Sequence, residues 1–301
     1  MTLSTQNLTL TYGDRAILQN IDLAFPPGKI SVLVGPNGCG KSTLLRALAR
    51  LLKPKAGVVY LDGQAIAKLS PQELARRQGI LPQSPTAPEG LTVRDLVAQG
   101  RYPHQTWWRQ WSAEDEHWVE TAIALTHLES LAHRDVATLS GGQRQRAWIA
   151  ILLAQNPSTL LLDEPTTYLD LAHQLEILDL LRDLNRRLGK TIVMVLHDLN
   201  QACRYGDWMT VLRSGQIYAS GPPQTTVTET MMRDVFALES HIMADPVLGM
   251  PLCIPIGPLG TTAPAVGRTR GSGGGGDLGR GALTAAEGVD IRGTADREAQ
   301  G

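Results

Sequence analysis

The residues best suited to chemistry form a glycine-rich loop. Residues 35–42 fit the pattern G-x-x-x-x-G-K-[ST], follow an apolar run at 30–34 and precede a helical pattern over 43–51. Glycines let backbone N–H groups turn around phosphates, and a helix N-terminus adds its dipole to the same anion site. We expect Lys41 to reach the β- and γ-phosphates and Ser42 to hold Mg²⁺. The loop and the residue after it are Gly35, Pro36, Asn37, Gly38, Cys39, Gly40, Lys41, Ser42 and Thr43.

Cys39 lies inside this loop and admits two interpretations. The helix N-terminus could lower the pKa of its thiol and make the thiol reactive. The position could instead simply tolerate a small side chain, and this is the interpretation that we favour.

A pair of carboxylates follows a second apolar run. Residues 159–162 lead directly into Asp163 and Glu164, and α/β proteins bind ligands at the carboxyl ends of their strands. We expect Asp163 to hold Mg²⁺ through a water molecule, and Glu164 to act as the general base or to orient an attacking water. An acidic strand end without a catalytic role is the alternative.

Such motifs need a sheet that positions them. The runs at 30–34, 159–162 and 191–196 are short and nearly all apolar, as expected of parallel strands that helices cover on both faces. The core is therefore predicted to be α/β, with the phosphate loop of the P-loop nucleoside triphosphatases (NTPases) at the end of its first parallel strand.

Two further regions are expected around this core. Apolar residues alternate over 8–12 and 21–25, and a β-rich run follows at 58–61, which predicts an antiparallel β-subdomain near the N-terminus. The pattern then turns helical, and residues from about 84 to 157 are expected to form an inserted helical subdomain.

The composition excludes several classes of protein. The 301 residues are 43% hydrophobic and 19% charged, which is enough apolar material for a sizeable core. A formal net charge of −1 gives no basic footprint for nucleic acid. Three scattered cysteines favour a reducing compartment. No apolar run approaches the roughly 20 residues that span a bilayer, and no secretory signal is seen, so we expect a cytoplasmic location.

The composition changes near residue 257. Residues 257–301 hold 13 of the 30 glycines and no periodic apolar face, so they cannot bury enough surface to offset the entropy lost on ordering. We expect residues 1–256 to form one folded unit and residues 257–301 to form a disordered tail.

A third motif, together with the two described above, indicates the protein family. Residues 139–143 read L-S-G-G-Q, just before a helical stretch and 20 residues before Thr159. Together with the phosphate loop and the Asp163-Glu164 pair, this motif makes residues 3–256 resemble the nucleotide-binding subunit of an ABC transporter. The resemblance implies that the chain binds ATP and Mg²⁺ and hydrolyses ATP.

The resemblance also implies roles for single residues. Tyr12 matches the aromatic residue that stacks on adenine, although a core tyrosine is the alternative. Gln83 matches the glutamine that contacts Mg²⁺ and the attacking water, and His197 matches the histidine that contacts the γ-phosphate and holds the geometry with Glu164. Asp170 matches a loop that crosses the dimer interface.

The L-S-G-G-Q segment implies an assembly. Its residues Ser140, Gly141, Gly142 and Gln143 begin a predicted helix, which is a second anion site in a chain that already has one. In the family this second site caps the γ-phosphate bound to the partner subunit. The resemblance therefore implies a head-to-tail homodimer with ATP held between the subunits.

Segments 91–97, 100–104 and 165–174 look like those of importer ATPases for iron(III) siderophores. This resemblance implies an integral-membrane permease as partner, an extracytoplasmic substrate-binding protein as indirect partner, and a position at the inner face of the cell membrane. Haem or vitamin B12 as cargo is the close alternative. A regulatory ATP-binding module without productive hydrolysis is the other, and the presence of Glu164 argues against it.

Overall fold

The computed structural model describes residues 2–105 and 111–260. The segment 106–110 and residues 261–301, which make up most of the predicted tail, lie outside the described residues. Within the described part, helices alternate with strands around a largely parallel sheet. The expected α/β class is therefore confirmed.

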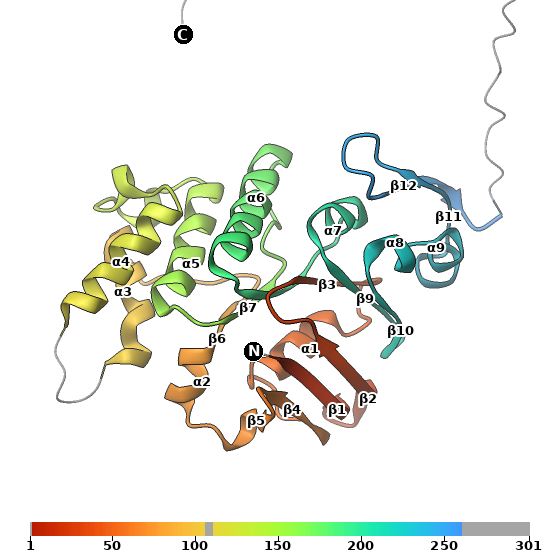
Figure 1. Cartoon of the computed structure of the whole chain (residues 1–301), viewed down its shortest axis with the longest axis horizontal. Helices are drawn as coiled ribbons and strands as arrows, with labels where there is room; N and C mark the ends of the chain where they lie inside the picture. The colour runs from red at the N-terminus through yellow and green to blue at the C-terminus, as the bar shows by residue number, and fades with distance from the viewer. Residues whose placement is uncertain (1, 106–110, 261–301) are drawn as a thin grey trace, which may run out of the picture. The chain divides into compact units, whose positions relative to one another are not determined.

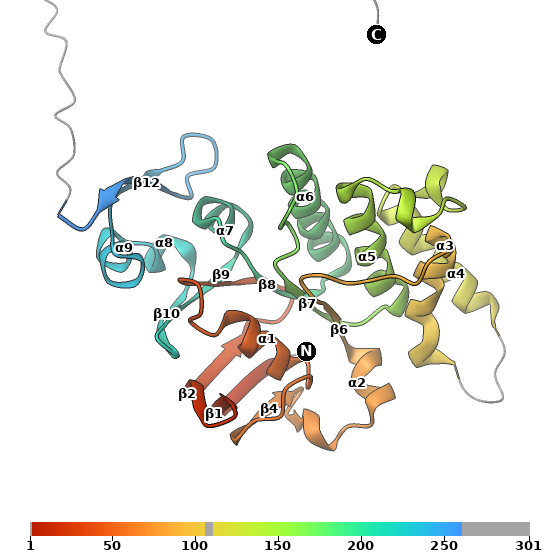
Figure 2. The ribbon, with the colours of Figure 1, turned by 180° about the vertical axis from the view of Figure 1, so that it is seen from behind.

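A six-stranded sheet forms the centre of this fold (Figures 1 and 2). From one edge to the other its strands are β10 (Gln216–Gly221), β9 (Trp208–Arg213), β3 (Ile30–Val34), β8 (Thr191–Val195), β7 (Thr159–Asp163) and β6 (Gln78–Leu81). All neighbours from β9 to β6 run parallel, whereas β10 pairs antiparallel with β9. Every residue of β3, β7 and β8 is buried, which explains their nearly unbroken apolar sequences.

The predicted antiparallel region forms a second sheet. Its strands, in spatial order, are β2 (Arg15–Phe25), β1 (Leu3–Tyr12), β4 (Ala56–Leu61) and β5 (Gln64–Ala65). All its pairings are antiparallel, and the red and orange strands of Figure 1 show its place beside the central sheet. The alternating apolar residues of β1 and β2 supply its buried face.

Two apolar cores lie on opposite faces of the central sheet, because successive side chains of a strand point in opposite directions. Leu33 and Leu161 face one core, which they share with the antiparallel sheet and with Leu44 of α1 (Lys41–Leu48). Val32 and Leu160 face the other core, under the later helices. The helix that begins at the phosphate loop is thus fixed between two sheets.

The regular elements described between β6 and β7 are all helical. They are α3 (Val93–Ala98), η2 (Gln99–His104), α4 (Ala113–Leu125), η3 (Glu129–Leu131), η4 (Val136–Thr138) and α5 (Gly141–Gln155). Capping boxes start α3, α4 and α5, so each start is encoded locally by a Ser or Thr with an Asp or Gln three residues later.

The remaining elements complete both faces. They are η1 (Ile66–Lys68), α2 (Pro71–Arg77), α6 (Leu171–Leu188), α7 (Leu199–Tyr205), α8 (Pro223–Thr226), α9 (Glu229–Phe236), β11 (Leu238–Ala244) and β12 (Pro251–Pro258). The β11–β12 hairpin was not expected from the sequence. Asn200 of α7 anchors it with two hydrogen bonds: Nδ2 donates to the Cys253 carbonyl at 3.1 Å and Oδ1 accepts from the Cys253 N–H at 2.8 Å.

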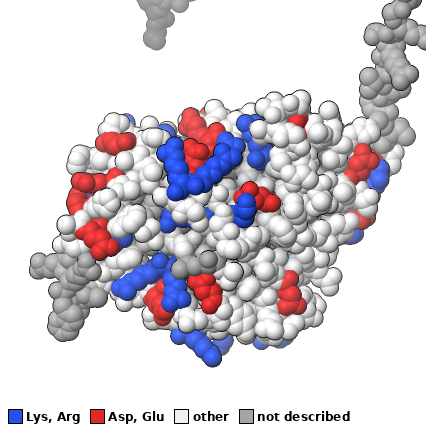
Figure 3. All heavy atoms as spheres, in the orientation of Figure 1, with Lys and Arg blue, Asp and Glu red and all other residues white. Residues whose placement is uncertain are grey.

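Every helix in the described part of the chain is too short or too polar to cross a bilayer. On the face shown in Figure 3, Lys and Arg side chains lie among Asp and Glu side chains, and most of the surface is uncharged. The mixed signs agree with the formal net charge of −1.

A buried ion pair ties the helical segment together. Arg101 of η2 and Asp115 of α4 are 1% and 3% exposed. Arg101 donates from Nε to Asp115 Oδ1 at 2.9 Å and from Nη1 to the carbonyl of Ala154, near the end of α5, at 2.8 Å. Burial alone would raise the pKa of Asp115, but hydrogen bonds from Ser112 and Arg101 outweigh it and lower that pKa. Asp115 therefore stays ionised at neutral pH.

We predict that the substitution Arg101→Met destabilises the protein by about 3–5 kcal/mol, because it leaves the charge of the Asp115 carboxylate buried without its cationic partner. Arg94→Met is the matched control. It breaks the ion pair between Arg94 and Glu116, whose side chains are both about one-third exposed, so it should cost about 1 kcal/mol or less. Urea unfolding of the two variants measures the difference, and equal losses would contradict the assignment.

Candidate functional site

The phosphate loop lies between β3 and α1, as its motif predicts. Lys41 is 5% exposed, and its Nζ donates to the carbonyls of Gly35 at 2.8 Å and Pro36 at 3.1 Å. Gly35 has a φ of +147°, and a Cβ there would lie 2.2 Å from the carbonyl oxygen of Leu212. Only glycine fits this position, so the tight loop that curls around the Lys41 ammonium depends on it.

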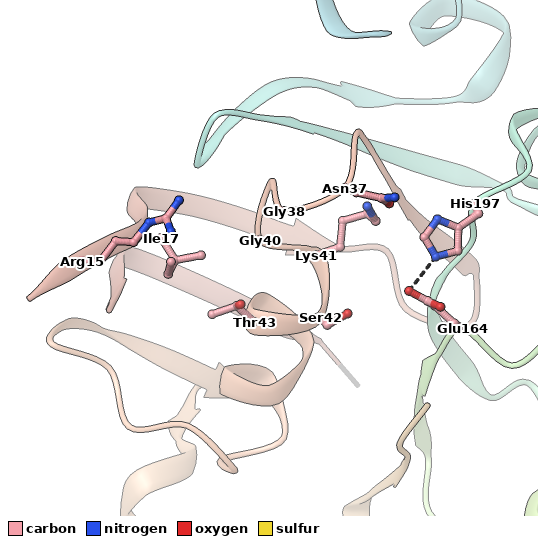
Figure 4. A pocket seen from close by; sticks show the side chains of 10 residues that line it. All are labelled: Arg15, Ile17, Asn37, Gly38, Gly40, Lys41, Ser42, Thr43, Glu164 and His197. Atoms are coloured by element: carbon pink, nitrogen blue, oxygen red, sulfur yellow. Dashed lines mark ion pairs between the residues drawn. The ribbon is translucent and has the colours of Figure 1, made fainter. Parts of the chain in front are cut away.

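A cavity of about 310 Å³ opens over the loop (Figure 4). Eight of the predicted residues line it: Asn37, Gly38, Gly40, Lys41, Ser42, Thr43, Glu164 and His197. Arg15 and Ile17, at the start of β2, also line it and were not predicted. Tyr12 does not line the cavity. It pairs with Arg15 across the β1–β2 hairpin and is 47% exposed.

Two oxygen donors meet where α1 begins. The Ser42 hydroxyl donates to Asp163 Oδ1 at 2.8 Å, although 121 residues separate them in the sequence. Asp163 is 3% exposed. Burial is the main cause that raises its pKa, the neighbouring Glu164 charge adds to it, and the Ser42 hydrogen bond opposes it. A nearby cation would lower this pKa and favour the ionised form of the carboxyl.

The carboxylate of Glu164 is held at both of its oxygens. His197 Nε2 lies 2.6 Å from Oε1, an ion pair drawn as a dashed line in Figure 4. Gln83 Nε2 donates to Oε2 at 2.5 Å, and the Thr167 hydroxyl donates to the same oxygen at 3.0 Å. Glu164 also has a φ of +52°. A left-handed conformation is strained for Glu, and such strain gathers at functional sites.

Cys39 is 5% exposed. Its Sγ lies 4.0 Å from Lys41 Nζ, which lowers the pKa of the thiol, but burial is the larger effect and the net pKa is raised. The thiolate is therefore disfavoured, in agreement with the interpretation of Cys39 as a small packing residue.

The L-S-G-G-Q segment caps α5 and lies outside the cavity. Ser140 is the N-cap: its hydroxyl accepts from the Gln143 N–H at 3.3 Å, and the Gln143 side chain accepts from the Ser140 N–H at 3.1 Å. The four predicted residues Ser140, Gly141, Gly142 and Gln143 do not line the cavity of the same chain.

The loop before α6 packs on this segment. Asp170 is the N-cap of α6, and its Oδ1 accepts from the backbone N–H of His173 at 2.9 Å and from His173 Nδ1 at 2.7 Å. These two hydrogen bonds lower the pKa of Asp170. The oriented His173 ring fills the space beside Gly142, where a Cβ would lie 2.6 Å from Cδ2 of the ring.

Sequence reasoning missed four contributors to this region. Arg15 and Ile17 are two residues apart after the Gly13-Asp14 turn, so strand alternation could have placed them on one face. Thr167 and His173 bond to predicted neighbours within three residues of their own positions. Local spacing was the available signal in each case.

Known proteins are similar to this chain in sequence. Residues 18–167 match the family model described as ABC transporter. The petrobactin import ATP-binding protein FpuD of Bacillus anthracis is 57% identical over 255 residues, which cover 85% of this chain and 93% of that protein. The ferric enterobactin transport ATP-binding protein FepC of Escherichia coli K12 is 50% identical over 260 residues, covering 86% and 95%.

A solved structure is similar as well. It is a dimeric ATP-binding cassette in a post-hydrolysis state, bound to ADP and Pi, and it shares 33% identity with this chain at a TM-score of 0.63. The match covers 73% of this chain and 98% of that one.

We predict that Gly142→Ala lowers the stability of the native protein but not that of a His173→Ala variant. In the native protein the new Cβ collides with the His173 ring, and overpacking of this kind costs about 1–3 kcal/mol. In a His173→Ala background the collision disappears, so Gly142→Ala becomes neutral or stabilising, as Gly→Ala in a helix usually is. Thermal unfolding of the double-mutant cycle measures this coupling.

Gly141→Ala is the control, because its Cβ would meet only the flexible tip of Leu169 at 3.3 Å. Additive effects of Gly142→Ala and His173→Ala would contradict the packing described above.

Proposed function

This chain belongs to the ABC transporter family of ATP-binding proteins, and from that premise we propose that it is the subunit whose ATP hydrolysis powers uptake of ferric siderophores across the cell membrane. One observation carries the hydrolytic part: Gln83, Glu164 and His197 meet within hydrogen-bond distance at the rim of the phosphate-loop cavity. The three residues come from three different parts of the sequence, and the hydrolysis of a bound nucleotide needs such groups there.

The phosphate loop supports binding of the nucleotide triphosphate. Its backbone N–H groups and the N-terminus of α1 stabilise negative charge, and the Lys41 ammonium exchanges its contacts with the loop carbonyls for the β- and γ-phosphates. Ser42 and Asp163 provide the hard oxygen donors that Mg²⁺ prefers, and Gln83 is the third predicted contact. When bound, Mg²⁺ would neutralise charge on the phosphate oxygens.

Glu164 is proposed to orient the attacking water and accept its proton. The contacts of His197 and Gln83 with opposite oxygens of the carboxylate fix its direction before the substrate arrives. The side chain of His197 is 47% exposed and lines the cavity, where a γ-phosphate could reach it. Transfer to water needs positioning and charge stabilisation, with no covalent enzyme intermediate.

A homodimer is proposed to complete the site. Ser140 and Gly142 present a helix N-terminus that does not reach the cavity of their own chain, so a second subunit would bring them to its γ-phosphate. Tyr168 and Leu171, on either side of Asp170, are 88% and 66% exposed. Large apolar side chains exposed beside a functional loop support an interface there, and the similar solved cassette is dimeric.

A membrane permease is the proposed second partner. The segment 85–89 begins two residues after Gln83. It lines a groove of about 350 Å³ together with Val136, Ala137, Arg144 and Trp148. A largely apolar groove that carries one cation, Arg144, and one carboxylate, Glu89, suits an amphipathic helix. Docking there would hold the chain at the inner face of the cell membrane, with an extracytoplasmic binding protein delivering cargo to the permease.

The proposed cargo rests on the relatives. Proteins named for petrobactin and ferric enterobactin are 57% and 50% identical to this chain over more than nine-tenths of their own lengths. Haem and vitamin B12 are the alternative cargoes for the same mechanism.

We predict that Glu164→Gln lowers the ATPase rate by about 10²–10⁴-fold while ATP binding persists, because the amide keeps the shape of the carboxylate but cannot accept the proton. ATP should then accumulate the variant as a dimer, which light scattering after size exclusion detects. Glu176→Gln, on the exposed face of α6, is the control and should hydrolyse ATP at the native rate. EDTA should abolish hydrolysis in both.

The same variant tests the cargo in cells. Cells whose only copy is Glu164→Gln should lose uptake of labelled ferric siderophore and retain uptake of labelled haem and vitamin B12. Loss of haem or vitamin B12 uptake alone would replace the cargo and keep the mechanism, whereas an unchanged ATPase rate would overturn the mechanism itself.

We predict that Thr86→Arg, an exposed change inside the groove, reduces co-purification of the permease at least tenfold without changing nucleotide affinity. A long cation at this position blocks the groove and adds to the charge of Arg144. Thr225→Arg, on the distant helix α8, is the matched control. Full co-purification of Thr86→Arg would refute docking at the groove.

A further inference from the structure

A second cavity lies at the amino ends of the central strands, whereas the phosphate loop lies at their carboxyl ends. It has a volume of about 320 Å³ and reaches Ile30, the first residue of β3, and Asp207, which precedes β9. Helices α6, α7 and α8 and the connection between β11 and β12 enclose it. The five residues of β3, about 16 Å of strand, separate this cavity from the nucleotide site, so it is a different site.

Three arginines converge on this cavity. Arg182 and Arg186 lie one turn apart on α6, and Arg204 comes from the end of α7. Two of the guanidinium groups lie over the Tyr205 ring, with Arg182 Cζ 4.9 Å and Arg204 Cζ 5.7 Å from its centroid. Like charges four residues apart on an exposed helix face repel one another and weaken the helix slightly.

The acids nearby compensate only part of this charge. Asp179 accepts from Arg182 Nη2 at 2.5 Å and from the Tyr205 hydroxyl at 3.1 Å. Asp207 contacts other groups than the three arginines. Its Oδ2 accepts from the Ile30 N–H at 2.9 Å, and its Oδ1 lies 4.0 Å from Lys29 Nζ.

Donors remain unused at the cavity. The Nε of Arg182 is buried and has no hydrogen-bond partner among residues 2–105 and 111–260. Within the same residues, Arg186 and Arg204 take part in no ion pair within 4.0 Å, whereas the neighbouring Arg187 pairs with Asp183 at 3.8 Å. A buried donor without a partner is costly, and two unpaired guanidinium groups at one hollow supply further donors.

We propose that this cavity binds a small multivalent anion that carries phosphate or carboxylate groups. The planar guanidinium fork matches both groups in bidentate geometry, and three forks around one hollow can bind more than one such group at once. Leu248 and Met250 supply an apolar wall for the carbon part of an organic anion. The volume is at the small end of ligand cavities, which favours a compact ligand.

The test is calorimetric titration of the full-length chain carrying Lys41→Ala, a change that weakens the anion site of the phosphate loop. Pyrophosphate and citrate are titrated separately at an ionic strength matched with sodium chloride. We expect 1:1 binding of at least one of them in the millimolar range or tighter. In the double substitution Arg186→Gln/Arg204→Gln binding should weaken at least tenfold, and in Arg187→Gln it should be unchanged.

The two probes separate the chemistry. Binding of pyrophosphate alone assigns a phosphate site, binding of citrate alone a carboxylate site, and binding of both a site for either group. A ligand-induced rise in Tm that the double substitution removes is the second readout. Because Arg186 and Arg204 are exposed, their loss should leave the Tm without anion nearly unchanged. Absence of saturable binding, or binding that survives the double substitution, overturns the proposal.

Discussion

The register of the parallel strands is the constraint on which the site depends. Val32, Met194, Leu162 and Leu81 pair side by side across β3, β8, β7 and β6. The chain therefore leaves the sheet at nearly the same level in all four strands, and Gly35, His197, Glu164 and Gln83 follow within three residues of that row. A shift of one residue in any strand would turn its alternating side chains over and separate the carboxylate from its partners.

This constraint is enforced by burial. Each central strand contributes to both cores, so a slip would move side chains of different size and shape from one close-packed core into the other. The strained turn at Glu164 and the glycine at position 35 are tolerated because the strands before them are fixed. Rigid strands with irregular loops at their ends are a general way to hold functional groups in α/β proteins.

Much of this was predictable, because its signals are local. A phosphate loop needs particular residues at fixed spacing, and a strand covered on both faces needs an apolar run. The capping boxes that start α3, α4 and α5 each need only four consecutive residues. Other contacts, which the sequence did not predict, depend on packing between distant segments. The contact of Gly142 with His173 and the two hydrogen bonds between Asn200 and Cys253 leave no periodic pattern in the sequence. Tyr12 was assigned from its type, and its role stays a prediction. Strand geometry also brings Arg15 and Ile17 to the cavity.

The same geometry explains how hydrolysis could be linked to a partner. Gln83 contacts Glu164 through its amide, and only Ser84 separates it from the segment that lines the groove beside α5. Loop residues this close along the chain cannot move independently, so we expect an occupant that displaces the segment to change the contact of Gln83 with the Glu164 carboxylate. A ligand does conformational work only through different affinities for two states. In the proposed dimer ATP has such a difference, because Ser140 and Gly142 of one subunit reach the phosphates of the other only when the two are closed.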